Sequence, residues 1–316
     1  MNSKAGDAIA ADQLAVSIQP GEDTELTTVV TGAGARIAPL AEADALIWTG
    51  SNPADFPAVL PERISWVQLP LAGIENWISR GVIDARRVWT SAAGAYADTV
   101  AEHALMLLLA GVRALPGCVR AQSWQSAAPL SKIGTLRGAT VTVLGAGGIG
   151  RAMIPMLDAV GARVLAVNRR GLPVPGATRT VPVEDLDQVW PVTDHVVVAA
   201  PATPATRHLI GAAELTALKP TSWLVNVARG DLVDTDALVV ALRAGTLAGA
   251  ALDVTAPEPL PDGHPLWQEP RAVITPHIAN PTTMLRRALA ERVAENVSRR
   301  AAGRELLGRV DLSSGY

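Results

Sequence analysis

Short apolar runs alternate with helix-like or loop segments along most of the chain. In the first part of the chain, such runs fall at 14–18, 45–48, 66–69 and 88–90. In the second part they fall at 140–144, 163–167, 195–199, 223–227, 248–253 and 272–275. Their lengths and their β-branched residues are typical of buried strands. Strands that alternate with helical segments predict α/β architecture with parallel sheets, a small one first and then a doubly wound sheet of six or more strands.

Two longer stretches have helical periodicity. Residues 98–114 are strongly apolar, which suits a helix buried between two domains or two subunits, and Pro116 and Gly117 end it. The segment from there to residue 137 lacks periodicity and is interpreted as a linker or arm. The stretch 282–300 is amphipathic and follows the last strand, so it can return to the first part of the chain. This pattern places a domain boundary near residue 100.

Length and composition narrow the class of protein. At 316 residues the chain exceeds one typical core, so two domains are expected. A net charge of −3 gives no general case for binding nucleic acid or a membrane surface. The longest uncharged apolar run, 104–112, is far short of the roughly 20 residues that span a bilayer. Residues 1–13 carry no apolar core of a signal peptide, and the single cysteine, Cys118, allows no intramolecular disulfide. A cytoplasmic globular protein is expected.

The run 141–150, Val-Thr-Val-Leu-Gly-Ala-Gly-Gly-Ile-Gly, joins an apolar strand to a glycine-rich turn. Glycines at this spacing permit a tight turn, let the backbone approach a pyrophosphate closely, and allow the next helix to pack on the sheet. The first N–H groups of that helix then point at the phosphates. Because the motif follows one strand and precedes another, we interpret it as a dinucleotide site rather than a purely structural turn. The coenzyme-binding candidates in it are Gly145, Gly147, Gly148, Ile149 and Gly150.

Charged side chains follow three of the later strands. Arg229 and His277 each lie just past a buried strand, and Glu258 lies between two prolines that restrict its loop. Ligands of doubly wound sheets bind outside the carboxyl ends of the strands. These three side chains are therefore expected at the edge of the sheet where a nicotinamide lies. Taken singly, a strand-end arginine is more often a surface ion pair and a single histidine is more often structural.

A turn in the first part of the chain offers a possible anion site. Leu71, Ala72 and Gly73 connect an apolar strand directly to a polar helix start. Such a strand end can present backbone N–H groups to an anion. An ordinary turn between a strand and a helix explains this stretch equally well on its own.

Taken in order, these motifs resemble those of the D-isomer-specific 2-hydroxyacid dehydrogenases, which include glyoxylate and hydroxypyruvate reductases. The resemblance extends over about residues 14–302, and its matching stretches are 72–73, 100–103, the glycine loop, 201–206, 227–230, 253–259 and 275–277. It implies a Rossmann coenzyme domain, 101–281, inserted in a smaller flavodoxin-like α/β substrate domain made of 1–100 and 282–316. It also implies a homodimer built on the long helix and the arm.

The resemblance implies an enzyme that transfers hydride between a nicotinamide coenzyme and a small 2-keto or D-2-hydroxy acid, with glyoxylate or hydroxypyruvate favoured. Its catalytic residues are then Arg229, Glu258 and His277. The chemistry of the residue types agrees with these roles. A histidine titrates near neutral pH and can donate the proton to the keto oxygen, while an ionised glutamate beside it favours the imidazolium. An arginine can clamp and polarise the substrate. Substrate contacts are expected from Leu71, Ala72, Gly73, Arg229 and His277.

The same resemblance carries over further coenzyme contacts. They are Pro201, Thr206, Val227, Ala228, Arg229, Asp253 and His277, and Asp253 is expected to bond the nicotinamide carboxamide. The strand after the glycine loop ends in Asn168, Arg169 and Arg170, where NAD-specific members carry an acidic residue. Asn168 can bond a ribose or a phosphate without a charge penalty, and both arginines can bond a 2′-phosphate. NADP(H) is therefore expected to be preferred, with NAD(H) possible, although two solvated arginines remain the plainer alternative.

Other residues have plainer interpretations or affect only the pocket. His103, His195, His208 and His264 are interpreted as structural, and no cluster has metal-ligand spacing, so no metal is expected. Besides Leu71, the candidates for lining the substrate pocket are Ile74, Trp77 and residues around Trp267 or Met284. Asn280 departs from the family, in which a small residue is more usual, and this departure affects the size of the pocket.

A binding module is the alternative to an enzyme. The resembling family includes co-repressors that keep the fold and bind the dinucleotide while acting through protein partners. An intact catalytic trio favours turnover. Tight dinucleotide binding without turnover of any 2-keto acid would favour the co-repressor.

Overall fold

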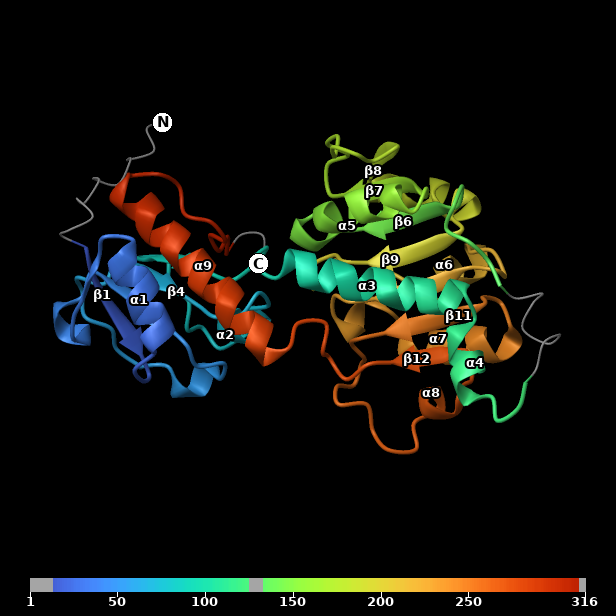
Figure 1. Cartoon of the computed structure of the whole chain (residues 1–316), viewed down its shortest axis with the longest axis horizontal. Coiled ribbons are helices and arrows are strands. Elements are labelled where there is room, and N and C mark those ends of the chain that lie inside the picture. Colours follow the sequence, from blue (N-terminus) through green and yellow to red (C-terminus); the bar gives the residue numbers. More distant parts are fainter. Residues whose placement is uncertain (1–13, 125–132, 313–316) are drawn as a thin grey trace. The chain divides into compact units, whose positions relative to one another are not determined.

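The computed structural model describes residues 14–124 and 133–312, which form two compact units (Figure 1). The first unit comprises the chain up to residue 96 and from 281 onward, and the second comprises 97–280. These limits lie a few residues from the domain boundaries expected near 100 and 281, and the division into domains stays a prediction. The expectations for residues 1–13 and for 125–132 of the arm lie outside the described residues.

The first unit is built on a five-stranded parallel sheet with the order β2-β1-β3-β4-β5. This is the flavodoxin-like order, and it confirms the fold expected for this part of the chain. Its strands are β1 (Ala15–Gln19), β2 (Arg36–Ile37), β3 (Ala45–Trp48), β4 (Trp66–Gln68) and β5 (Val88–Thr90). Its helices are α1 (Thr24–Gly32), α2 (Glu75–Ser79) and α9 (Thr282–Ala301). The sequence pattern did not predict β2, because two exposed residues, only one of them apolar, form no apolar run.

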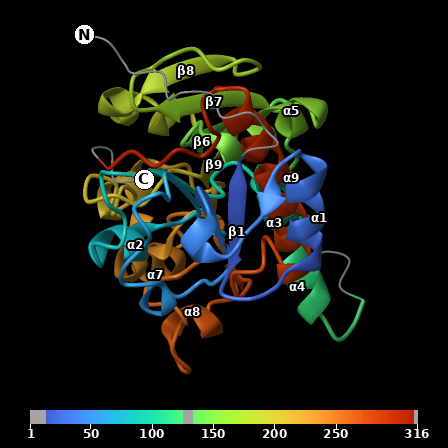
Figure 2. The ribbon, with the colours of Figure 1, turned by 90° about the vertical axis from the view of Figure 1, so that its left-hand side faces the viewer.

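The C-terminal helix α9 returns to the first unit and packs beside α1 (Figures 1 and 2). A buried polar cluster fixes it to the sheet. The Asn296 side-chain amide donates to Gln68 Oε1 at 2.9 Å, and the Thr90 hydroxyl donates to the same oxygen at 2.8 Å. All three side chains are fully buried. Since an unpaired buried polar group costs about 1–3 kcal/mol, this cluster specifies one docking position for the helix.

Aromatic residues fill the core of the first unit. The Phe56 ring lies 5.0 Å from Trp48, 5.5 Å from Trp77 and 5.6 Å from Trp89 between ring centroids. Ile74 and Trp77, expected as pocket residues, are only 3% and 1% exposed within this core. That expectation is wrong, because the short helix α2 turns its apolar side toward the sheet.

The second unit contains a seven-stranded parallel sheet with the order β12-β11-β10-β9-β6-β7-β8. Counted from β6, this is the Rossmann order with one more strand at the edge, as the sequence predicted. The strands are β6 (Thr140–Leu144), β7 (Arg163–Asn168), β8 (Arg179–Pro182), β9 (His195–Val198), β10 (Trp223–Asn226), β11 (Gly249–Leu252) and β12 (Ala272–Ile274). The edge strand β8 was not among the predicted strands, because it is short and only partly buried.

The helices of this unit cover its sheet. They are α3 (Ala97–Val112), α4 (Leu115–Arg120), α5 (Gly148–Ala159), α6 (Ala212–Ala217), α7 (Thr235–Ala244) and α8 (Pro265–Gln268). The long helix α3 packs on β10, β11 and α5. Gly111 permits this approach, since a Cβ there would lie 2.3 Å from the Trp223 indole. Pro116 does not simply end a helix as expected, because α3 stops at Val112 and Pro116 lies in the first turn of α4.

His195 is a buried structural histidine at the start of β9. Its Nδ1 accepts a hydrogen bond from the Trp223 backbone N–H at 3.2 Å, and the residue is 7% exposed. Burial lowers the pKa of His195 to about 4, although Asp194 opposes the shift and Lys219 adds to it. The His195 ring is therefore neutral in the folded protein at neutral pH.

This histidine predicts a loss of stability in mild acid. The unfolded ring has a pKa of about 6.5. Between pH 6.5 and about pH 4, His195 binds a proton in the unfolded chain but not in the folded chain. The free energy of unfolding therefore falls as the pH falls through this range. The shift in the pKa of His195 corresponds to about 3 kcal/mol of the free energy of unfolding. The variant His195→Asn should lack this part of the dependence on pH, because Asn keeps a hydrogen-bond acceptor but does not titrate. Urea unfolding measured across this pH range checks it. Equal acid sensitivity in this variant, wild type and a His264→Asn control would contradict the prediction.

Among residues 14–124 and 133–312, none of the helices combines the length and the apolar character that crossing a bilayer requires. In the same ranges, no cluster of three or more His, Cys, Asp or Glu side chains is arranged to hold a metal ion.

Candidate active site

The carboxyl ends of three neighbouring strands bring the candidate catalytic residues to one edge of the second sheet. The strands β10, β11 and β12 are adjacent and parallel. Arg229 follows β10, Asp253 directly follows β11, and His277 follows β12. Because parallel strands end on the same side, these residues share the edge at which doubly wound sheets bind ligands.

Glu258 and His277 form a direct pair. Glu258 Oε1 lies 2.6 Å from His277 Nδ1, and the two side chains are 41% and 50% exposed. The second carboxylate oxygen accepts from the Thr255 N–H at 3.4 Å, which orients the carboxylate. The Nδ1 atom is engaged by Glu258, so Nε2 is the ring atom left to exchange a proton with a substrate.

The backbone of His277 has an unusual conformation. Its φ is 53°, in the left-handed region that non-glycine residues rarely adopt. The His277 N–H donates to the carbonyl oxygens of Asp253 and Thr275, both at 2.9 Å. A conformation of this kind persists only where surrounding contacts fix it, and such positions cluster at functional sites.

Asn226 shapes the loop that carries Arg229. Its amide nitrogen donates to the Arg229 carbonyl at 2.9 Å, and its amide oxygen accepts from the Ala228 N–H at 3.0 Å. Arg229 Nη1 also donates to the Ala228 carbonyl at 2.7 Å. Asn226 is 1% exposed, so the loop is built around a buried side chain. Arg229 as a whole is partly exposed.

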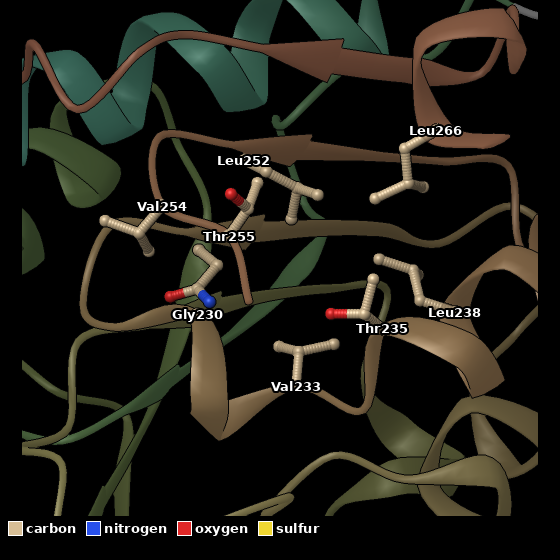
Figure 3. A pocket seen from close by; sticks show the side chains of 9 residues that line it. Gly230, Val233, Thr235, Leu238, Leu252, Val254, Thr255 and Leu266 are labelled. Carbon is tan, nitrogen blue, oxygen red and sulfur yellow. The ribbon is translucent and has the colours of Figure 1, made fainter. Parts of the chain in front are cut away.

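Gly230 brings the Arg229 loop against the Glu258 loop. A Cβ on Gly230 would lie 2.0 Å from the Thr255 carbonyl oxygen, so only glycine fits. Behind this contact is a small, mainly apolar pocket lined by Gly230, Val233, Leu238, Leu252 and Leu266 (Figure 3). Since none of the catalytic candidates lines it, we interpret this pocket as a packing gap beneath the site rather than as the substrate site.

The glycine loop has the geometry that a dinucleotide requires. Gly145 has a φ of 98°, and a Cβ there would lie 2.5 Å from the Ala200 backbone. A Cβ on Gly150 would lie 2.2 Å from the Gly145 carbonyl oxygen, so this glycine permits close packing of α5. A Cβ on Gly147 would meet nothing within 4 Å. Open space at Gly147, at the start of a helix whose first N–H groups lack partners within the helix, fits a pyrophosphate.

Other coenzyme candidates contribute mainly backbone atoms. Val227 and Ala228 are each 6% exposed, and their N–H groups donate to Val198 and to Asn226. The Thr206 hydroxyl donates to the Pro201 carbonyl at 2.8 Å and accepts from the Thr203 N–H at 2.8 Å. The Thr206 side chain therefore stabilises the loop 201–206 through bonds to its backbone.

The turn after β7 presents two arginines. Asn168 does not extend toward solvent, because its amide nitrogen donates to the Leu172 carbonyl at 2.7 Å and its oxygen accepts from the Arg170 and Leu172 N–H groups at 3.1 Å. Both arginines are exposed, and within the described ranges neither Arg169 nor Arg170 has a side-chain partner. Asn168 thus orders the turn, and the arginines are the groups available to a phosphate.

The candidate anion turn lies in the first unit, after β4. Leu71 and Gly73 are partly exposed and Ala72 is exposed. Over the part of the chain described here, no acceptor is seen for the N–H groups of Ala72 and Gly73. The Tyr96 hydroxyl donates to the Pro70 carbonyl at 2.6 Å, and burial raises the pKa of Tyr96 to about 12, so it stays a donor. The Tyr96 bond therefore holds this turn in place, and the N–H groups of Ala72 and Gly73 are available as donors to an anion.

Sequence reasoning missed several contributors to the site. Asn226 was not singled out from the sequence, although a buried strand that ends in an amide was an available signal. His103 was interpreted only as a structural histidine, and its ring contacts both Thr275 and Asp253. Asn280 accepts from the Thr99 hydroxyl at 3.2 Å, and its buried amide nitrogen has no partner among the described residues.

The sequence of the chain is similar to those of known proteins. The sequence pattern of the D-isomer specific 2-hydroxyacid dehydrogenase, NAD binding domain, matches residues 103–279. An uncharacterized protein encoded in the proB 3′ region of Corynebacterium melassecola is 42% identical over 293 residues, which are 92% of this chain and 96% of that protein. A glyoxylate reductase of Thermofilum pendens is 37% identical over 214 residues, 66% of this chain and 63% of that enzyme.

A solved structure extends the similarity to the whole fold. The D-isomer specific 2-hydroxyacid dehydrogenase of Xanthobacter autotrophicus Py2, in complex with NADPH and MES, superposes with a TM-score of 0.80 at 28% identity. The superposition covers 96% of this chain and 99% of that chain. The chain therefore belongs to the D-isomer specific 2-hydroxyacid dehydrogenase family and is an oxidoreductase that uses a nicotinamide dinucleotide.

Proposed function

We propose that this enzyme reduces a small 2-keto acid, glyoxylate or hydroxypyruvate in the first place, to the D-2-hydroxy acid and that it prefers NADPH. The observation that carries the proposal is the 2.6 Å contact between Glu258 and His277 at the sheet edge that also carries Arg229. Relatives named glyoxylate reductase and glyoxylate reductase/hydroxypyruvate reductase support the choice of substrate.

The chain's own residues divide the work of the reaction. When bound, the reduced nicotinamide supplies the hydride. His277 donates a proton from Nε2 to the keto oxygen, and Glu258 on Nδ1 stabilises the protonated ring before that transfer. Arg229 clamps the substrate and stabilises the charge that develops on its oxygen. The N–H groups of Ala72 and Gly73 bind the carboxylate.

The coenzyme would be bound by groups at the same edge of the sheet. Gly147, Gly148, Ile149 and Gly150 offer open space and backbone N–H groups to the pyrophosphate. Gly145, Pro201, Thr206, Val227 and Ala228 form the walls around it. Asp253 ends the neighbouring strand, but its side chain is only 1% exposed and its oxygens accept from Thr275, Ile278 and Ala279. Its bond to the nicotinamide carboxamide stays a prediction.

Two arginines support the preference for NADPH. Replacing both Arg169 and Arg170 with Ala should lower kcat/KM for NADPH at least about tenfold, because each charge-assisted bond to the 2′-phosphate contributes roughly 1.5–3 kcal/mol. The value for NADH should change little, since NADH lacks that phosphate. Initial rates with both coenzymes check the prediction. Arg243→Ala, on an exposed position of α7, is the matched control for loss of positive charge. Equal losses with both coenzymes would count against a phosphate site.

A panel of small 2-keto acids, assayed with NADPH and NADH, tests the function itself. We expect coenzyme oxidation with glyoxylate or hydroxypyruvate. Tight coenzyme binding without oxidation by any member of the panel would instead support the co-repressor role. The Thermofilum pendens relative is named a glyoxylate reductase, and the paired Glu258 and His277 favour turnover.

We also infer a cytoplasmic homodimer that uses α3 and α4. Four large apolar side chains near these helices are substantially exposed: Met106, Leu115, Val119 and Trp124, at 48%, 49%, 75% and 95%. Clustered exposed apolar groups commonly mark an interface. A second copy of the chain is the partner that the family resemblance implies.

A further inference from the structure

The Asp253 carboxylate is the centre of a buried hydrogen-bond cluster beside the active site. Its Oδ1 accepts from the Thr275 hydroxyl at 2.5 Å and from the Ile278 N–H at 3.0 Å, while Oδ2 accepts from the Ala279 N–H at 3.1 Å. The side chain is 1% exposed. The carboxylate therefore binds the backbone on the C-terminal side of His277, and its own carbonyl binds the His277 N–H.

One further group completes this cluster from outside the loop. His103, in the middle of α3, places Nε2 at 3.2 Å from Asp253 Oδ1 and 3.1 Å from Thr275 Oγ1, and its side chain is 13% exposed. The Thr275 hydroxyl donates its one hydrogen to Asp253 Oδ1, so it can only accept from His103. The His103 Nε2 atom therefore carries the hydrogen in its contact with Thr275.

The position of His103 is fixed independently of the active site. Helix α3 packs on β10 and β11, and Gly111, two turns further on, lies against the Trp223 indole. The helix is therefore a rigid support for its side chains. The His277 loop, in contrast, contains a left-handed residue that needs external contacts to stay in place.

We propose that His103 is a positioning residue, which through Thr275 and Asp253 fixes the His277 loop in the conformation that presents the imidazole to Glu258 and the substrate. The expected effect on kcat rests on the proposed function, whereas the expected effect on the position of His277 does not. His103 itself touches neither the reacting atoms nor Glu258 in the described contacts.

The test compares three forms of the full-length enzyme: wild type, His103→Leu and His103→Gln. Leu fills the space without a donor, whereas the Gln amide can place an N–H near the position of Nε2. We expect His103→Leu to lower kcat about 10- to 100-fold, the range for a misplaced catalytic group, with NADPH affinity within about twofold. His103→Gln should recover kcat to within about threefold of wild type.

A spectroscopic readout separates this proposal from the proposed function. The chain has only 5 histidines, so the ring signals of His277 can be assigned in isotope-labelled protein by comparison with His277→Ala. In His103→Leu these signals should shift or broaden, and in His103→Gln they should resemble wild type. If wild type reduces no 2-keto acid, the proposed function fails, and the His277 signals still decide the positioning role.

The outcomes that would overturn the proposal are specific. Unchanged kcat and unchanged His277 signals in His103→Leu would show that the contact positions nothing. A loss in His103→Gln as large as that in His103→Leu would assign the effect to packing rather than to the Nε2 donor. If His103→Leu does not fold, His103→Gln is compared with His103→Asn, whose shorter amide lies further from Asp253. Equal kcat values in that pair would also overturn the proposal.

Discussion

His277→Ala should lower kcat by roughly 10² to 10⁴, equivalent to about 3–5 kcal/mol of lost transition-state stabilisation, the range for a positioned general acid. The imidazole is half exposed at the sheet edge and is oriented by Glu258 through a 2.6 Å contact, so its loss removes the proton donor without opening the core. NADPH affinity should stay within about twofold, because we expect the glycine loop and the arginine turn to provide the main coenzyme contacts. Single-turnover and steady-state rates, with fluorescence titration of NADPH, measure both quantities.

A control separates loss of the acid from loss of any histidine. His264 caps α8, where its Nδ1 accepts from the Leu266 N–H at 3.2 Å, and Asn can replace that acceptor. His264→Asn should keep wild-type kcat. Activity of His277→Ala within a few-fold of wild type would remove His277 from the mechanism.

Arg229→Lys should lower kcat/KM for the keto acid about 10- to 100-fold, although the charge is kept. A guanidinium offers two parallel donors to a carboxylate or keto oxygen, whereas an ammonium acts as a point charge. The loop backbone should survive the change, because Asn226 bonds the Arg229 carbonyl rather than its side chain. Substrate-saturation curves at fixed NADPH check the prediction.

The matched control for this change is Arg243→Lys, an exposed arginine in the last turn of α7. It should leave kcat/KM unaltered. Near-normal kinetics in Arg229→Lys would mean that charge alone matters at this position, or that Arg229 does not touch the substrate.

The architecture could be predicted because it depends on local signals. Runs of buried β-branched residues identify strands, and a glycine loop between two of them constrains both the turn and the helix that follows. The strand orders of both sheets confirm the Rossmann and flavodoxin-like expectations. The two strands that sequence reasoning missed, β2 and β8, are short edge strands whose residues, apart from Val181, are exposed or only partly buried. Such strands form through pairing with a neighbour rather than through their own pattern.

Roles that depend on side-chain direction could not be predicted from the sequence. Asn168 was expected to meet the coenzyme, but its amide is used within its own turn. Ile74 was expected at the substrate but belongs to the core of the first unit. His103 lies 150 residues before Asp253 in the chain numbering, so no spacing rule links them, and only the folded sheet and helix place the two side chains in contact.

The configuration of the product tests the central claim most directly. Wild-type enzyme would be incubated with NADPH and hydroxypyruvate, or with another keto acid of the panel that gives a chiral product, and the hydroxy acid would be resolved by chiral chromatography. The account predicts the D-isomer, formed in step with NADPH oxidation and strongly reduced in His277→Ala. The L-isomer, a racemic product, or no product from any 2-keto acid would contradict it.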